Sequence, residues 1–154
     1  GVLTAASFSK ISDGAGAAVL MSAEEAGKRG LKPLARIVAH AGHSQAPEWF
    51  TTAPVKAISN VLAKAGWSVE DVDLFEVNEA FSCVAMAPMK DLGISHEKLN
   101  VNGGAVALGH PIGASGARLV VTLLHALRAR GVKRGVASLC IGGGEATAVA
   151  IGLL

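Results

Sequence analysis

The sequence predicts an α/β layered fold, and three observations support this prediction. Apolar runs typical of strands alternate along the chain with segments of helical periodicity. The C-terminal part consists of two apolar runs joined by three glycines, residues 142–144, which is typical of a hairpin. Apolar residues make up 51% of the 154 positions but aromatic residues only 4%. The core is therefore expected to contain mainly small side chains, which let helices lie close to a sheet.

Near the N-terminus the sequence predicts a strand, a short helix and a second strand. Residues 15–21 form a continuous apolar run typical of a buried strand. Ser22 is a suitable N-cap for a helix that begins with acidic residues and ends at about Gly27 or Gly30. Residues 34–41 then predict another strand.

The next helix is marked at both ends. Thr52 can cap it, Pro54 lies in its first turn and Gly66 ends it. Its apolar face consists of Val55, Ile58, Leu62 and Ala65. Residues 73–77 follow as a short strand.

The C-terminal half is predicted to hold two more helices and a hairpin. One helix opens at Asn78, and Pro88 should kink or shorten it. A glycine-rich segment, residues 101–117, leads into an amphipathic helix that ends at Gly131. The hairpin strands are residues 136–141 and 146–154.

Charge and cysteine content exclude several classes of protein. The net charge is +2, from 14 Lys and Arg against 12 Asp and Glu, which is too balanced for a protein that binds nucleic acid or a membrane surface. Two cysteines form no disulfide framework and no metal-ligand spacing is present. Every apolar stretch of membrane-spanning length is interrupted by Gly, Pro or charge. The opening at Gly1, without Met or a leader, indicates a chain that starts inside a larger protein.

Two polar residues lie where strands end or helices begin, which is the ligand-binding rim of an α/β sheet. Asn78 can cap the next helix, or its carboxamide can position a water or a substrate carbonyl. His110, between Gly109 and Pro111, is either a surface histidine in a turn or a catalytic group. Its segment is neither a Walker loop nor a dinucleotide fingerprint. It is not a nucleophile elbow, because Ala117 stands where that motif needs glycine.

The remaining candidate site residues are the cysteines and the small hydroxyl residues near the N-terminus. Cys140 ends a predicted strand before three glycines, so its thiol and nearby backbone N–H groups can face one cleft, as in an oxyanion hole. The alternative is a buried structural cysteine beside a hairpin. Cys83 is interpreted as a core residue. The N-terminal hydroxyl residues, which form a turn or contact a ligand, are Thr4, Ser7, Ser9 and Ser12.

Three blocks in this order resemble the thiolase family: NEAF at 78–81, NVNGGAVALGHPIGASGAR at 100–118 and CIGGG at 140–144. The resemblance covers essentially the whole chain, and its second block is long and specific. Thiolases make or cleave 3-ketoacyl-CoA by a Claisen reaction through a thioester on an enzyme cysteine. The resemblance therefore implies an acyltransferase of fatty acid metabolism that acts on acyl-CoA and CoA, with no bound cofactor and no metal.

The resemblance also implies an architecture. A thiolase has two similar halves, so this chain is expected to be one half of that layered fold, a mixed sheet flanked by helices. Residues 1–31 match the last strand and connector of the N-terminal half, and residues 32–154 match the C-terminal half. The nucleophilic cysteine lies in the N-terminal half, which is an expected partner. The parent is expected to be a homodimer or homotetramer, in the cytoplasm of a bacterium or in the mitochondria or peroxisomes of a eukaryote.

Particular residues take roles from this resemblance. His110 is implied to activate the nucleophile and to stabilise the enolate oxygen, with a water held by Asn78. Cys140 is implied to move the α-proton, and the N–H of Gly142 belongs to the second oxyanion hole. For these roles a neutral His110 would donate an N–H, and Cys140 would need a lowered pKa.

The resemblance places Ser9 and Phe81 along the CoA-binding tunnel. Phe8 and Lys10 depart from the family pattern on the CoA side, and residues 50–54 depart from it in the loop that borders the acyl pocket. Two other functions stay open. One is a hydrolase in which Cys140 and His110 act together, and the other is an inactive half-fold that serves only as an interaction module.

Overall fold

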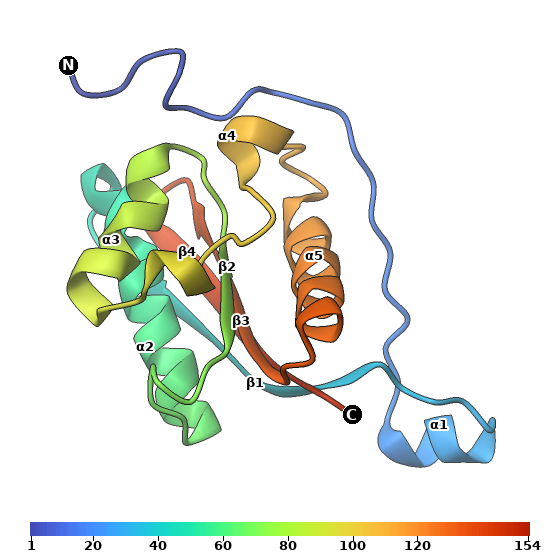
Figure 1. The fold of residues 1–154 in the computed structure, drawn as a ribbon. Coiled ribbons are helices and arrows are strands. Elements are labelled where there is room, and N and C mark those ends of the chain that lie inside the picture. The colour runs from blue at the N-terminus through green and yellow to red at the C-terminus, as the bar shows by residue number, and fades with distance from the viewer.

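The computed structural model describes all 154 residues and contains a four-stranded mixed sheet with the order β1-β4-β3-β2 (Figure 1). The strands are β1 (Ala35–Ser44), β2 (Leu74–Val77), β3 (Arg134–Ile141) and β4 (Glu145–Leu153). β4 is antiparallel to both β1 and β3, whereas β2 is parallel to β3. The carboxyl ends of β2 and β3 therefore lie at the same edge of the sheet. The predicted α/β class with a mixed sheet is confirmed.

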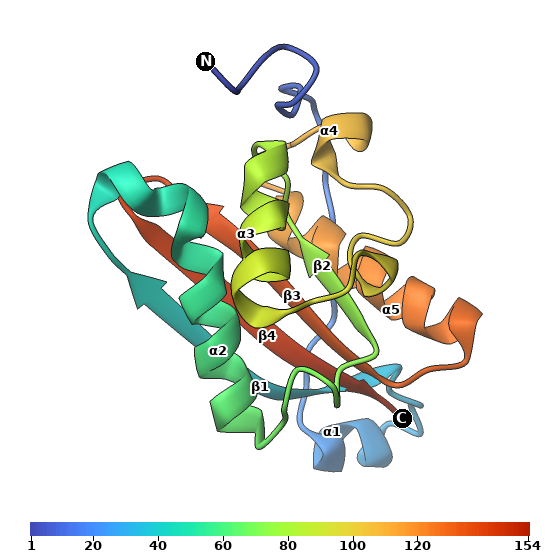
Figure 2. The ribbon, with the colours of Figure 1, turned by 60° about the vertical axis from the view of Figure 1, so that its left-hand side comes forward.

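Helices cover both faces of the sheet (Figure 2). α2 (Ala53–Ala65) and α3 (Ser82–Leu92) lie on one face, and α5 (Ser115–Arg130) lies on the other. The shorter helices are α1 (Ala23–Lys28), α4 (Ala105–Leu108) and the 3-10 helices Pro47–Thr52 and His96–Lys98. No helix combines the length and the apolar character that crossing a membrane would require.

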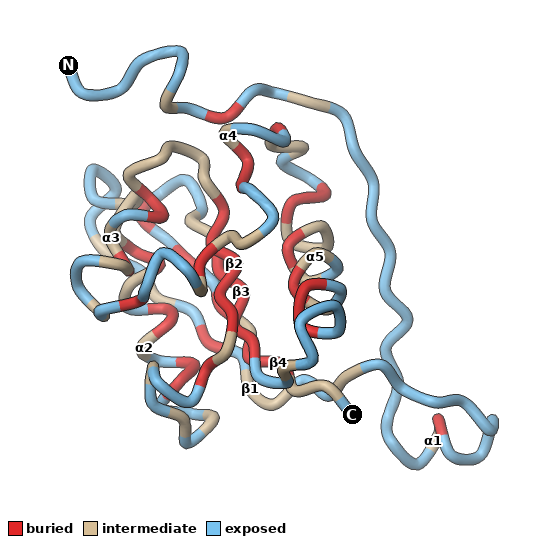
Figure 3. The backbone as a smooth tube through the Cα atoms, in the orientation of Figure 1, coloured by how far each residue is buried: buried red, intermediate tan, exposed pale blue.

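Two apolar cores lie between these layers, where the buried positions of Figure 3 gather. The larger core lies under α2 and α3 and includes Ile58 and Phe75, and the smaller one lies under α5 and includes Leu119 and Leu123. A Cβ added to Gly135 of β3 would come within 2.9 Å of Leu123. The absence of a side chain at this position thus lets α5 lie close to the sheet, as the composition predicts.

Several helix ends follow the predicted signals. The hydroxyl of Ser22 accepts a hydrogen bond from a backbone N–H in the first turn of α1. α2 ends at Gly66 and α5 at Gly131, and both glycines have positive φ (67° and 68°). An exception is Thr52, which does not cap α2 through its side chain. Its backbone is helical and not extended, because the preceding 3-10 helix runs directly into α2.

The strand predicted at residues 15–21 is wrong. These residues are exposed and pair with no strand, and Val19 is 86% exposed. The segment instead passes along α5 (Figure 1). A Cβ on Gly16 would come within 2.9 Å of Ala117, so this backbone approaches the helix closely. An apolar run becomes a strand only where a sheet edge is available to pair with it, and here the segment crosses a helix.

The predicted start of α3 is wrong, and Pro88 does not end this helix. α3 begins at Ser82, after Phe81 in an extended conformation, so Asn78 does not open it. The helix also continues through Pro88 to Leu92. Pro88 is buried, and its ring packs into the interior without ending the helix.

Candidate active site

An extended N-terminal segment, residues 7–11, connects the two loops that hold the candidate catalytic residues. The backbone N–H of Ser9 donates to the carbonyl of Ala80 at 3.1 Å. On its other side, the N–H of His110 donates to the carbonyl of Lys10 at 2.8 Å. The loop after β2 and the glycine-rich loop are therefore attached to the same piece of backbone.

Asn78 follows β2 directly and is fully buried. Its backbone N–H donates to the carbonyl of Ser138 at 2.9 Å, which extends the pairing of β2 with β3. Its side-chain Oδ1 accepts a hydrogen bond from Nη2 of Arg118 at 3.3 Å, and its Nδ2 lies 3.4 Å from Nε2 of His110. The N-cap interpretation is wrong, because α3 starts four residues later and the amide faces an imidazole.

His110 is held at both ring nitrogens. Its Nδ1 lies 2.5 Å from the hydroxyl oxygen of Ser115, and this hydroxyl donates its only hydrogen to the carbonyl of Pro111 at 3.0 Å. When the Ser115 hydroxyl donates to Pro111, Nδ1 donates to Ser115, and the lone pair on Nε2 then lies beside the amide of Asn78. A half-buried imidazole with two partners is not simply a surface histidine in a turn.

The tautomer changes what neutral His110 can do. Burial, followed by the positive charge of Arg118, lowers the pKa of His110 below its ordinary value, so the ring is neutral at pH 7. Its one N–H is occupied by Ser115. In this tautomer the neutral imidazole presents an acceptor at Nε2, and the expected donor at Nε2 stays a prediction. Nε2 donates only after it has taken up a proton.

Cys140 lies near the carboxyl end of β3, opposite Ala146 of β4. It is half-buried and packs against the larger core. Burial raises the pKa of the Cys140 thiol, so the expected lowered pKa is wrong. Cys140 is at the same sheet edge as Asn78, but no hydrogen bond joins it to Asn78 or His110. Cys83 packs against the same core, as predicted.

Gly142 opens the turn between β3 and β4. It is exposed, and its backbone N–H makes no hydrogen bond within the chain. The next two residues, Gly143 and Gly144, have φ values of 94° and 92°, which glycine adopts without strain. This turn therefore leaves an N–H available two residues after Cys140.

A buried ion pair that the sequence pattern did not reveal lies beside Asn78. Glu76 of β2 is 1% exposed, and its Oε2 lies 3.5 Å from Nη1 of Arg118 on α5. Burial raises the pKa of Glu76 to about 7, against the opposing effect of Arg118. The sequence feature that could have indicated this pair is the single carboxylate inside the apolar strand LFEV, because an unpaired buried charge would be costly.

A second unpredicted residue fastens the glycine-rich loop. The carboxylate of Glu79 accepts hydrogen bonds from Nδ2 of Asn100 at 2.9 Å and from the N–H of Val106 at 3.1 Å. A Cβ on Gly104 would overlap the carboxylate of Glu79, so a side chain there would displace Glu79 from these hydrogen bonds. The NEAF block thus holds the second block in place.

The two residues expected near CoA make contacts within the chain. The hydroxyl of Ser9 donates to the carbonyl of Ala80 at 3.0 Å, and Ser9 is buried. The ring of Phe81 packs edge-on against Phe50, with centroids 6.2 Å apart. Within the N-terminal segment, the ammonium of Lys10 lies 5.7 Å from the ring centroid of Phe8.

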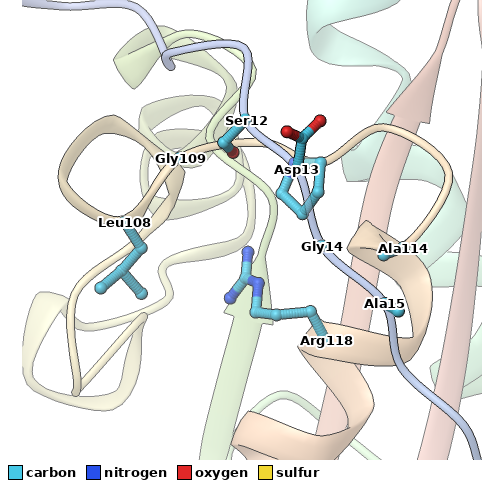
Figure 4. Close-up of a pocket in the computed structure, with 9 residues that line it drawn as sticks. Ser12, Asp13, Gly14, Ala15, Leu108, Gly109, Ala114 and Arg118 are labelled. Atoms are coloured by element: carbon cyan, nitrogen blue, oxygen red, sulfur yellow. The ribbon is translucent and has the colours of Figure 1, made fainter.

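A pocket of about 230 Å³ adjoins this site (Figure 4). Residues 12–15 and the loop around Gly109 form its walls, together with Ala114 and Arg118 of the α5 N-terminus. Figure 4 shows the Arg118 side chain extending from α5 into this space. Arg118 therefore lies next to a cavity, while its partner Glu76 is buried behind it.

The chain is similar to thiolases in both sequence and structure. Residues 31–152 match the family model described as "Thiolase, C-terminal domain". The cytosolic acetyl-CoA acetyltransferase of Mus musculus is 54% identical over 151 residues, and so is the acetyl-CoA acetyltransferase of Chromobacterium violaceum. Each match covers 98% of this chain but only 38% of the relative, so the chain spans less than two fifths of the length of these proteins.

Solved structures give the same result. The crystal structure of the Bacillus anthracis acetyl-CoA acetyltransferase superposes with a TM-score of 0.94 at 47% identity, over 99% of this chain and 39% of that one. Human mitochondrial 3-ketoacyl-CoA thiolase in complex with CoA gives a TM-score of 0.90 at 41% identity, again over 99% of this chain and 39% of that one.

Proposed function

The chain belongs to the thiolase family, where it corresponds to the C-terminal domain, and we propose that it supplies part of the active site of an acetyl-CoA acetyltransferase or 3-ketoacyl-CoA thiolase. The observation that carries this proposal is the convergence of Nε2 of His110 and Nδ2 of Asn78, 3.4 Å apart at the carboxyl edge of the sheet. A base and an amide donor at one point suit the formation and stabilisation of a thioester enolate.

In the proposed reaction, the acyl group is carried by a cysteine of the N-terminal half of the thiolase fold. Nε2 of His110 removes the proton from that thiol, and the thiolate attacks the keto carbon of 3-ketoacyl-CoA. When the carbon–carbon bond breaks, the electron pair goes to the acetyl-CoA enolate. The enolate oxygen then accepts hydrogen bonds from the protonated Nε2 and from the water held by Asn78.

Cys140 is proposed to protonate the enolate carbon. The raised pKa of its thiol supports this assignment, because a thiol that stays protonated at rest can act as an acid first. The resulting thiolate of Cys140 then takes the proton of the incoming CoA thiol, which attacks the acyl-enzyme. The nucleophilic cysteine leaves as a thiolate and recovers its proton from Nε2 of His110. The N–H of Gly142 stabilises the oxyanion of this second step. Condensation of two acetyl-CoA molecules follows the same steps in reverse.

The substrates, domain division, oligomeric state and location are also proposed from membership of the thiolase family. CoA thioesters are the substrates, and Ser9 and Phe81 lie on the side where CoA approaches. Residues 1–31 complete the N-terminal half and residues 32–154 form the C-terminal half, in a homodimer or homotetramer. Relatives described as cytosolic, bacterial and mitochondrial leave the bacterial cytoplasm and a eukaryotic organelle as proposed locations.

A hydrolase in which Cys140 itself is acylated has less support. Such an enzyme needs its thiol activated by a base, and here Cys140 has no hydrogen bond to His110 and a raised pKa. The proposed function is tested by thiolysis of acetoacetyl-CoA with the full-length protein that contains this chain. Wild-type activity that is lost in His110→Ala supports it, and an inactive wild-type protein contradicts it.

A further inference from the structure

We propose that Arg118 is a positioning residue, which orients the Asn78 amide toward His110 and is itself held in place by Glu76. This inference rests on the proposed function for its catalytic consequence, but the arrangement it describes can be measured without any activity.

The backbone brings the three groups together. Glu76 and Asn78 are two residues apart at the end of β2, so their side chains project to the same face of the sheet, the face covered by α5. Arg118 is the fourth residue of α5 and reaches down to both. Its Nη1 lies 3.5 Å from Oε2 of Glu76, and its Nη2 lies 3.3 Å from Oδ1 of Asn78.

Arg118 decides which end of the Asn78 amide meets His110. A guanidinium only donates hydrogen bonds, so the amide must present its oxygen to Arg118 and its NH₂ to Nε2 of His110. In the opposite orientation Oδ1 would face the lone pair of Nε2 at 3.4 Å, and two acceptors would oppose each other. Without Arg118 only the weak 3.4 Å contact with Nε2 of His110 would favour the productive orientation, because Arg118 is the one side chain that donates to Oδ1 of Asn78.

Glu76 keeps the guanidinium in this position. The Glu76 carboxyl is almost completely buried, while its Oε1 and the Nε of Arg118 have no hydrogen-bond partner. The pair is therefore incompletely satisfied and is not optimised for stability, since a buried ion pair with unmet groups adds little to it. The one specific interaction that this ion pair supports is the hydrogen bond from Arg118 to Asn78.

The charge of Arg118 also acts on His110. Among the groups around the imidazole, Asn78 and Ser115 are neutral, and Lys10 contributes its backbone carbonyl while its ammonium lies over the Phe8 ring. Arg118, from α5, is the charged side chain that lowers the pKa of His110, second to burial. Loss of this charge should therefore raise the pKa of His110.

The experiment uses the full-length protein with the variants Arg118→Met, Arg118→Lys and Glu76→Gln, and with Arg128→Met as the matched control, since Arg128 is exposed on the same helix. Thiolysis of acetoacetyl-CoA gives kcat and KM as a function of pH. Nitrogen NMR of histidine-labelled protein gives the tautomer and pKa of His110.

For Arg118→Met we expect kcat to fall about 10²-fold, the effect of a small misplacement of a catalytic group, with KM within about threefold of wild type. The pKa of His110 should rise. Arg118→Lys should keep the low pKa but recover only part of kcat, because an ammonium lacks the planar fork of a guanidinium. Glu76→Gln should give an intermediate loss of kcat.

The double variant Glu76→Gln/Arg118→Met separates positioning from stability. Removal of both charges should return the unfolding temperature from the lower values of the single variants toward that of the wild type. The kcat of the double variant should stay as low as that of Arg118→Met. If kcat returns together with stability, or if Arg118→Met behaves like Arg128→Met in kcat and in the pKa of His110, the proposal is overturned. A wild-type protein without thiolase activity contradicts the proposed function only, and the pKa of His110 in Arg118→Met still decides the role of Arg118.

Discussion

Nδ2 of Asn78 lies 3.4 Å from Nε2 of His110, although the two residues are 32 positions apart in the chain. Asn78 is placed by the last hydrogen bond between β2 and β3, and His110 by its bond to the N-terminal segment. The site therefore depends on the sheet, the glycine-rich loop and residues 7–11 together.

The first prediction concerns the tautomer of His110. Ser115→Ala removes the acceptor of the Nδ1 hydrogen, so the Nε2–H form should become populated and fewer molecules should present a base. We expect kcat to fall about tenfold, which corresponds to one hydrogen bond of about 1.4 kcal/mol. Nitrogen chemical shifts of the His110 ring report the tautomer. Ser59→Ala, in α2, is the control, and an unchanged ring spectrum in Ser115→Ala would refute the assignment.

The second prediction concerns stability against pH. Folding raises the pKa of Glu76 from 4.5 to about 7, so the folded chain binds more protons than the unfolded chain between these values. The contribution of Glu76 to stability is thus full below pH 4.5 and is lost as pH rises through 7. Relative to Glu76→Gln, the wild type should lose up to about 3 kcal/mol between about pH 4.5 and 8. Urea unfolding of both proteins measures this difference, and parallel pH profiles would disprove it.

The third prediction concerns the contact between the NEAF block and the glycine-rich loop. Gly104→Ala would force a Cβ into the carboxylate of Glu79, so we expect the free energy of unfolding to drop by about 1–3 kcal/mol. Gly27→Ala, in α1, is the control, because a Cβ there meets nothing within 4 Å. Equal unfolding free energies for the two variants would argue against close packing of the Glu79 carboxylate on Gly104.

The fourth prediction concerns the 154-residue chain by itself. Its two cysteines are Cys83, in the core, and Cys140, assigned to proton transfer, so the chain alone should not perform thiolysis of acetoacetyl-CoA. It should also self-associate, because large apolar residues such as Ile112 (73% exposed) and Leu20 (74% exposed) face solvent. Size-exclusion chromatography and a thiolysis assay test both points. A clean, active monomer would be incompatible with the proposed division of roles.

Elements with local signals were predictable from the sequence. Gly66 and Gly131 end their helices because each provides the left-handed conformation, and the apolar strands β3 and β4 form a hairpin around residues 142–144. Residues 15–21 carry the same apolar signal as a buried strand, but pairing requires a sheet edge, which local sequence does not encode.

The candidate site was only partly predictable for the same reason. Asn78 and His110 could be selected by type and place, but the His110 tautomer depends on Ser115, and the amide orientation on Arg118. The raised pKa of Cys140 comes from burial, which a cysteine before three glycines does not reveal.

The central claim is that Cys140 transfers the α-proton while another cysteine carries the acyl group. It is tested most directly by a paired measurement on full-length wild type and Cys140→Ser: acylation by acetyl-CoA, followed by protein mass, and exchange of the acetyl-CoA methyl hydrogens in deuterated water. We expect exchange to slow by about 10²- to 10⁴-fold in Cys140→Ser, the range for a positioned acid or base, while acylation is reduced much less. Loss of acylation alone, or equal loss of both, would contradict the claim.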